Sequence, residues 1–136
     1  MRRTLLVGFA LMVAACGDST GPTAIVGRWE LTAIEGQTLP VTLLPASGGG
    51  CSLDIQSGEL TLKDGGTYTA SRQFGQLFQG GLFCPSSQIE WGTYTTTGQT
   101  ITLRLYTGFT YQVQIEQGTL SHSVDGKRYV YHPTTM

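Results

Sequence analysis

The sequence predicts an all-β protein, with one antiparallel up-and-down β-barrel of about eight strands after an N-terminal signal peptide. Three observations lead to this prediction. Beyond residue 23, apolar and polar residues alternate in short runs, and no run has the spacing of an amphipathic helix. Turn signals that contain glycine separate these runs. Only 12% of the residues are charged, while glycine, threonine and tyrosine are frequent, which favours strands and tight turns.

The first residues have the pattern of an export signal. Arg2 and Arg3 precede a run without charge from Leu5 to Ala15. This run is shorter than the roughly 20 residues that a helix needs to span a bilayer, so it is typical of a signal peptide rather than a membrane anchor. We therefore expect residues 1–15 to be a signal peptide that is removed.

The end of this signal, Val13-Ala14-Ala15-Cys16, resembles the lipobox of bacterial lipoproteins. The resemblance implies cleavage before Cys16 and acylation of that cysteine; each buried acyl CH₂ contributes roughly 0.8 kcal/mol to membrane binding. The alternative is an ordinary secretory signal with a chance cysteine. Gly17 stands where the inner-membrane retention signal of enteric lipoproteins has Asp. We therefore expect a protein that lipid anchors in the cell envelope, at the outer membrane or cell surface. Residues 16–23 are polar and contain Gly and Pro, which predicts a flexible tether.

The expected strands follow one another from residue 24 to residue 133. The first, 25–34, places Trp29, Leu31 and Ala33 on one face. Pro40 interrupts the short apolar segment 39–44, which predicts an edge or loop. The other expected strands are 52–55, 58–63, 67–74, 88–96, 100–106, 109–116, 119–124 and 127–132. A meander that closes on itself leaves no exposed edge, so it favours a barrel, with a two-sheet sandwich as the alternative.

Two cysteines remain once Cys16 is assigned to lipid, namely Cys51 and Cys84. In an oxidising compartment such a pair usually forms a disulfide. In the chain-entropy model, the loop that this bond closes contributes roughly 3.5–4 kcal/mol to stability. Free thiols and a shared metal are the alternatives, and the second is disfavoured because no histidine is near either cysteine in sequence.

The start of the first strand, Gly27-Arg28-Trp29, resembles the Gly-x-Trp signature of the lipocalins and of lipocalin-like domains in bacterial lipoproteins. The resemblance implies that Trp29 packs across one end of a barrel and that an arginine of the last strand, here Arg128, lies over it in a cation–π contact. Stacking of Trp29 on a ligand is the alternative. The chain departs from the lipocalin pattern, because it is shorter and lacks both the helix near the last strand and the Asp-bearing motif. The resemblance also implies binding of a small apolar or amphipathic ligand.

An apolar, glycine-rich segment at 74–83 interrupts the alternation. Its side chains either cap the mouth of the barrel or form a rim for a lipid, a small apolar ligand or a partner protein. We predict Phe78, Phe83, Trp91 and Tyr111 as residues that line a ligand site. For Trp91, packing in the core is the alternative.

The chain shows no catalytic constellation. It has no serine in a nucleophile-elbow pattern, no phosphate-binding loop and no carboxylate pair that stands out. His122 and His132 are the only histidines, and no further ligands accompany them at metal-binding spacing, so we expect neither metal nor cofactor. His122 shares a face with Leu120 and Val124, which predicts a buried, neutral and hydrogen-bonded side chain.

The charge of the chain also limits its partners. The formal net charge is −1 and the basic residues are scattered, which argues against nucleic-acid binding. We expect a binding protein and not an enzyme, with the membrane reached through the N-terminal lipid. The alternative is a protein-interaction module with a filled barrel, for example an inhibitor of a hydrolase that attacks the envelope.

Overall fold

The computed structural model describes residues 25–44, 53–75 and 87–134, and these residues form a single sheet of ten antiparallel strands. The strands are β1 (Gly27–Ile34), β2 (Gln37–Thr38), β3 (Val41–Leu44), β4 (Leu53–Lys63), β5 (Thr67–Phe74), β6 (Ser87–Thr97), β7 (Thr100–Leu105), β8 (Thr110–Glu116), β9 (Thr119–Val124) and β10 (Lys127–Pro133). Within the described ranges no helix is long and apolar enough to cross a membrane.

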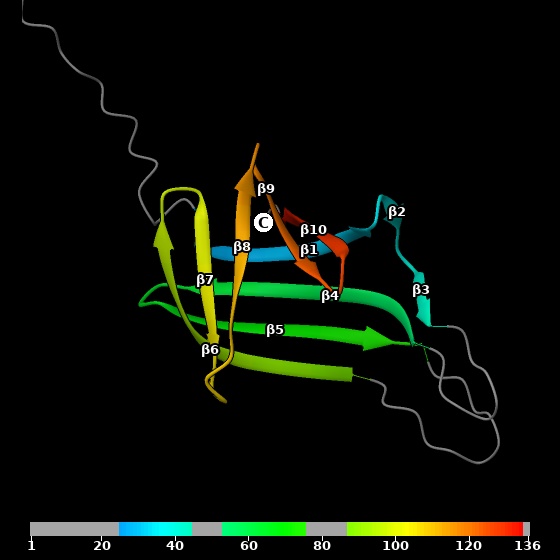
Figure 1. Cartoon of the computed structure of the whole chain (residues 1–136), viewed down its shortest axis with the longest axis horizontal. Helices are drawn as coiled ribbons and strands as arrows, with labels where there is room; N and C mark the ends of the chain where they lie inside the picture. The colour runs from blue at the N-terminus through cyan, green and yellow to red at the C-terminus, as the bar shows by residue number, and fades with distance from the viewer. Residues whose placement is uncertain (1–24, 45–52, 76–86, 135–136) are drawn as a thin grey trace, which may run out of the picture.

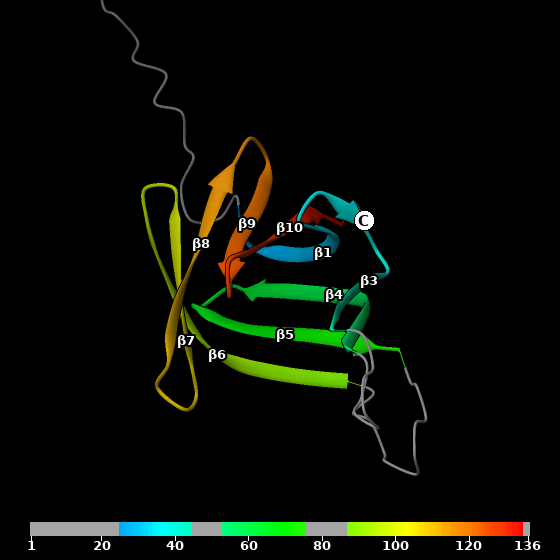
Figure 2. The same ribbon diagram turned by 45° about the vertical axis from the view of Figure 1, so that its right-hand side comes forward.

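The sheet closes into a barrel, as the sequence predicts. β1 pairs with β10 on one side and with β4 on the other, so the eight strands β1 and β4 to β10 form a complete ring. Figure 1 shows β4, β5 and β6 side by side, with β7 and β8 running across them, and Figure 2 shows β1 next to β4 with β10 beyond it. Because the ring is continuous, the alternative of a two-sheet sandwich is excluded.

Two short strands lie outside the ring of eight. β2 pairs with the end of β1, and β3 pairs with the start of β4. They pair with the parts of β1 and β4 that are not paired with each other, and β3 lies within the segment 39–44 that was predicted as an edge or loop. The predicted strands 52–55 and 58–63 are one strand, β4, with a register shift between Ile55 and Ser57.

A register shift in β1 changes which side chains enter the core. The predicted alternation holds for Trp29 and Leu31, which are buried. Between Leu31 and Ala33 the pairing with β10 shifts, and Ile34 points inward with no exposed surface. The prediction that Ala33 shares the inner face is therefore wrong, because a β-bulge reverses the alternation beyond it.

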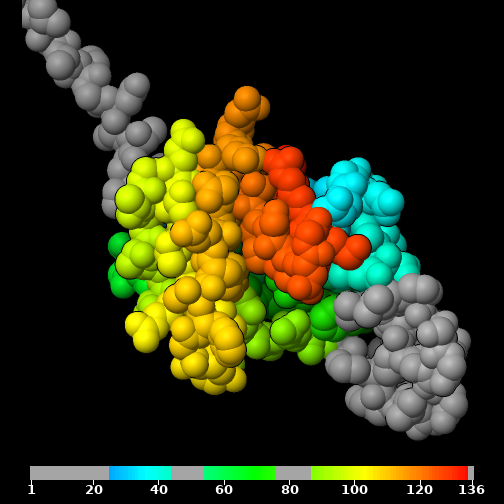
Figure 3. Space-filling view, in the orientation of Figure 1, coloured from blue at the N-terminus to red at the C-terminus, as the bar shows by residue number. Residues whose placement is uncertain are grey.

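The core consists of apolar and tyrosine side chains from the inner face of the barrel. Its buried members are Ile25, Trp29, Leu31, Ile34, Val41, Ile55, Leu60, Leu62, Tyr68, Ile101, Leu103, Val113, Leu120, Tyr129 and Tyr131. In the space-filling view, β7 to β10 (yellow to red) form one continuous outer surface on the side that faces the viewer (Figure 3).

Short turns join the strands of the second half of the chain. Gln117 and Gly118 connect β8 to β9, and Asp125 and Gly126 connect β9 to β10; all four have positive φ angles. Two consecutive positive φ angles define the type I′ turn, whose twist matches that of an antiparallel hairpin. The Gln-Gly and Asp-Gly pairs therefore account for the tight meander at these two places.

Several predictions fall outside the described residues. They concern the signal peptide and the tether with Cys16, the cysteines Cys51 and Cys84, and the side chains of Phe78 and Phe83. These stay predictions.

Candidate functional site

The two ends of the barrel differ. At one end, called here the Trp29 end, the indole of Trp29 is 6% exposed and its N–H donates a hydrogen bond of 2.9 Å to the carbonyl of Ile25. The opposite end, called the pocket end, carries the turns at 106–109 and 125–126. The Trp29 side chain is thus buried at this end of the barrel.

A pocket of about 330 Å³ lies at the pocket end. This volume is at the small end of the range of about 300–1,000 Å³ that is typical of ligand pockets. The walls come from five consecutive strands, β5 to β9, and from the turn between β7 and β8. The residues that line it are Arg72, Glu90, Leu105, Phe109, Thr110, Tyr111, His122, Ser123 and Val124. The pocket therefore combines apolar side chains with an arginine, a carboxylate, a tyrosine and a histidine.

Arg72 carries a positive charge on the inner face of β5. Its guanidinium carbon lies 5.3 Å from the centre of the Tyr129 ring, a cation–π contact. Burial lowers the pKa of Arg72, but the neighbouring Tyr131 and Glu90 raise it by more, so the side chain stays charged. Among the described residues, no carboxylate lies within ion-pair distance of the guanidinium. The positive charge of Arg72 is thus stabilised by the Tyr131 hydroxyl, by the ring of Tyr129 and, at longer range, by Glu90.

His122 is buried between two tyrosines. Its side chain is 6% exposed, and its ring centre lies 4.8 Å from that of Tyr111 and 5.6 Å from that of Tyr129. Burial, and then the charge of Arg72, lowers its pKa to about 4, so the ring is neutral at pH 7. Neither ring nitrogen has a hydrogen-bond partner in the described part of the chain. The prediction of burial and neutrality agrees with this geometry. The prediction of a hydrogen-bonded ring is wrong, because aromatic faces surround it.

Tyr111 lies in the pocket wall, where the sequence predicted a ligand-lining residue. Its hydroxyl donates a hydrogen bond to the carboxylate of Glu90. Burial, followed by Glu90, raises the pKa of Tyr111, so its hydroxyl stays protonated and able to donate. One oxygen of Glu90 is therefore engaged within the protein.

Trp91 does not line this pocket. It follows Glu90 in β6, and successive side chains of a strand point to opposite faces, so Trp91 points outward. Its side chain is 50% exposed and stacks on Tyr106, with ring centres 4.4 Å apart and planes 8° from parallel. Both predictions for Trp91, ligand lining and core packing, are thus corrected by its place on the outer surface.

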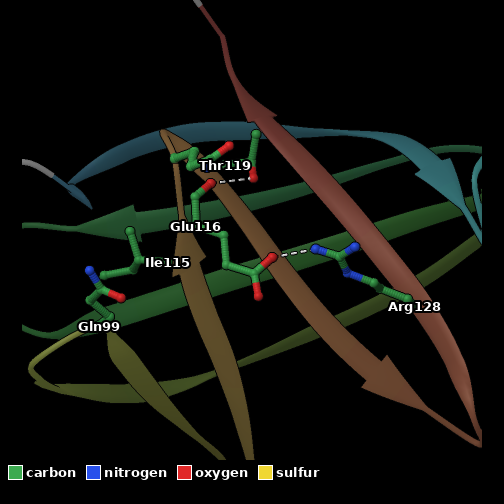
Figure 4. A pocket seen from close by; sticks show the side chains of 6 residues that line it. Gln99, Ile115, Glu116, Thr119 and Arg128 are labelled. Atoms are coloured by element: carbon green, nitrogen blue, oxygen red, sulfur yellow. Dashed lines mark hydrogen bonds and ion pairs between the residues drawn. The ribbon is translucent and has the colours of Figure 1, made fainter.

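Arg128 does not lie over Trp29. In the pairing of β1 with β10, Trp29 is opposite Pro133, whereas Arg128 precedes Tyr129, which is opposite Ile34. At about 3.3 Å per residue, the two side chains are well over 10 Å apart along the barrel. Figure 4 shows the Arg128 guanidinium directed at the carboxylate of Glu116 on the outer surface, where the two form an ion pair. The predicted cation–π contact is therefore wrong, whereas Gly27 and Trp29 occupy the start of β1 as expected.

The ion pair of Arg128 and Glu116 borders a hollow of about 510 Å³ on the outside of the barrel (Figure 4). Its volume exceeds that of the pocket inside the barrel. However, both charged side chains there are about half exposed and neutralise each other. Exposed ion pairs of this kind contribute little to binding or stability, about 0–1 kcal/mol. The pocket inside the barrel is therefore the better candidate for a specific site.

Sequence reasoning missed three of the polar residues that the barrel brings together, which are Arg72, Glu90 and the unpartnered His122. A signal was present for Arg72. Alternation in 67–74 puts it on the same face as Tyr68 and Phe74, and a charge on an apolar face is a marker of function. Within the described residues, no group of three or more His, Cys, Asp or Glu side chains could hold a metal ion.

A closed barrel of eight up-and-down strands, with Trp29 buried at one end and a pocket at the other, has the lipocalin-like architecture. No protein-family model matches the chain, and no curated protein is similar to it at a significant level.

Two solved structures are similar to the chain as folds. One is a lipocalin-like protein from Bacteroides uniformis ATCC 8492, with a TM-score of 0.45 and 15% identity over 82% of this chain and 99% of that one. The other is an uncharacterized protein from Bacteroides eggerthii DSM 20697, with the same TM-score and identity over 80% and 98%. At this level of similarity no residue role passes from them to this chain.

Proposed function

We propose that the protein is a lipid-anchored envelope lipoprotein whose barrel binds a small amphipathic ligand. Cleavage before Cys16 and lipid on that cysteine hold it at the outer membrane or cell surface. The barrel is a binding module and has no catalytic role. The signal-like residues 1–15 and the lipobox support the anchoring part of the proposal.

One observation carries the binding part: the 330 Å³ pocket combines apolar and polar walls inside one end of the barrel. Leu105, Phe109 and Val124 supply apolar surface. Arg72 and His122 supply polar groups that lack a full set of partners. A few polar groups in a mostly apolar pocket are the usual composition of a small-molecule site.

A pocket-filling variant tests this proposal. Val124 lines the pocket, whereas Val130 is on the neighbouring strand and points outward. We expect native mass spectrometry of the protein, purified from its own envelope, to detect a bound small molecule. Val124→Trp should abolish the adduct and Val130→Trp should keep it. An adduct that survives Val124→Trp, or a ligand-free mass for the unaltered protein, would contradict the proposal.

A second function, a protein-interaction module such as an inhibitor of an envelope-targeting hydrolase, is favoured by one surface feature. Ile89, Trp91 and Tyr106 are 50–64% exposed and belong to neighbouring parts of β6 and the turn after β7. Exposed apolar groups of this kind mark interaction sites when they are contiguous. Binding of an envelope protein that Trp91→Ser abolishes, together with a ligand-free barrel, would support this second function over the first.

A further inference from the structure

We propose that the pocket recognises the carboxylate of a small organic acid, with Arg72 and His122 as the groups that bind it. This inference rests on the proposed ligand-binding function and names the chemical class of the ligand. We expect the ligand to be an acid with one negative charge and a short apolar part.

Arg72 is the first of two groups in the pocket that favour an anionic ligand. A guanidinium has five N–H donors in a planar fork, which matches the two oxygens of a carboxylate. Here the fork lies on the inner face of the barrel, over the Tyr129 ring and beside the Tyr131 hydroxyl, which takes up part of its hydrogen-bonding capacity, and it forms no ion pair with any described residue. A charge inside a protein is costly to keep without a partner. An anion bound in the pocket supplies that partner.

His122 is the second group that favours an anion, and it does so independently of Arg72. More than nine-tenths of its surface is buried, it lines the same pocket, and neither ring nitrogen has a partner in the described part of the chain. A buried polar group without a partner costs about 1–3 kcal/mol. A neutral imidazole carries one N–H donor, so a carboxylate oxygen satisfies it.

Glu90 limits the charge that the ligand can carry. Its carboxylate lines the pocket and acts on Arg72 electrostatically, but it lies beyond ion-pair distance and accepts a hydrogen bond from Tyr111. A like charge in the same pocket repels an anion, and it repels a phosphate dianion more than a carboxylate. Glu90 therefore weakens binding of any anion and disfavours a ligand with more than one negative charge, which leaves a singly charged acid as the anion that the pocket tolerates best.

The volume of the pocket limits the size of the ligand's apolar part. About 330 Å³ is close to the lower limit for ligand pockets, which suits a small molecule rather than a long-chain lipid. Leu105, Phe109 and Val124 provide the apolar contact for that part.

Three probes that differ in one group test the inference: 4-phenylbutyrate, 4-phenylbutanol and 4-phenylbutylamine, titrated by calorimetry into residues 17–136 at pH 7.5. We expect the acid to bind about ten- to a hundredfold more tightly than the alcohol, as hydrogen bonds to charged groups imply. Arg72→Leu should reduce the affinity for the acid to that for the alcohol. The alcohol should bind the variant as before, which shows that the variant is folded. Glu90→Gln should strengthen binding of the acid.

Arg104→Leu is the matched control, because Arg104 is an exposed arginine of β7 and its loss changes the net charge equally. It should leave the affinity for the acid unchanged. If the alcohol binds but the acid binds no more tightly, or if the amine binds best, the inference is overturned while the ligand-binding function stands. If none of the three probes binds, both are overturned.

Discussion

His122 is the residue whose surroundings differ most from those of an ordinary histidine. Its ring lies between Tyr111 and Tyr129, with Arg72 and Glu90 on the strands opposite, and its pKa is lowered to about 4. In the unfolded chain the pKa is near 6.5. Between these two values the unfolded chain binds more protons than the folded one, so stability falls as the pH is lowered.

This difference predicts a specific pH dependence. Lowering the pH from 7.5 to 4.5 should reduce the free energy of unfolding by about 2–3 kcal/mol through His122 alone. His122→Phe keeps an aromatic ring but removes the titration, so the loss on acidification should be smaller by this amount. His132→Phe, at an exposed position of β10, should lose stability as the unaltered protein does. Urea unfolding at both pH values measures these differences, and equal losses in all three proteins would refute the assignment to His122.

At the scale of single elements, two strands approach each other closely at Gly92. A Cβ atom added there would lie 1.9 Å from the carbonyl oxygen of Arg104 on β7 and 3.0 Å from the Tyr68 ring. The carbonyl belongs to the backbone of the paired strand and cannot move aside without breaking the ladder between β6 and β7. The side-chain-free residue is therefore required by packing.

Gly92→Ala should accordingly lower the free energy of unfolding by at least about 2 kcal/mol. This is in the upper part of the range of about 1–3 kcal/mol that overpacking usually costs. Thr93→Ala changes the next, exposed residue of the same strand and should alter stability by no more than about 0.5 kcal/mol. Chemical unfolding with urea compares the two. A Gly92→Ala variant as stable as the unaltered protein would show that β6 and β7 are further apart than the structure places them.

The strands were largely predictable from the sequence because alternation and turn chemistry agree along the chain. The Asp125-Gly126 turn, for example, separates two runs that become β9 and β10 at the predicted positions. The bulge at Leu31 and Ala33 was not predictable, since no Gly or Pro marks it. β2 was not predicted either; it pairs with the end of β1, beyond the residues through which β1 pairs with β4.

The candidate site was less predictable than the strands, because the sequence did not show which face of each strand points into the barrel. Trp91 was expected at the site because it follows the glycine-rich segment 74–83 in the chain, but its neighbour Glu90 is the residue that points inward. Arg128 was expected at the Trp29 end, but pairing of β10 with β1 places it far along the barrel. Which face a strand turns inward depends on its register with its neighbours, and this is a property of the whole sheet.

At the scale of the whole molecule, closure of the sheet creates the site. Arg72, Glu90, Tyr111 and His122 come from four strands, and only the complete ring brings them around one pocket. Trp29 is buried at the opposite end, whereas this pocket lies at the pocket end. The central claim is therefore that a small ligand binds inside this end and not on the outer surface.

Chemical-shift mapping by NMR with 4-phenylbutyrate tests this claim most directly, and the two tryptophans serve as built-in reporters. The account predicts that the largest backbone amide shifts occur at Arg72, Tyr111 and His122, while the indole N–H signal of Trp29 stays unchanged. If instead the largest shifts centre on Trp91 and Tyr106, the ligand binds the outer surface, and the interior pocket is not the binding site.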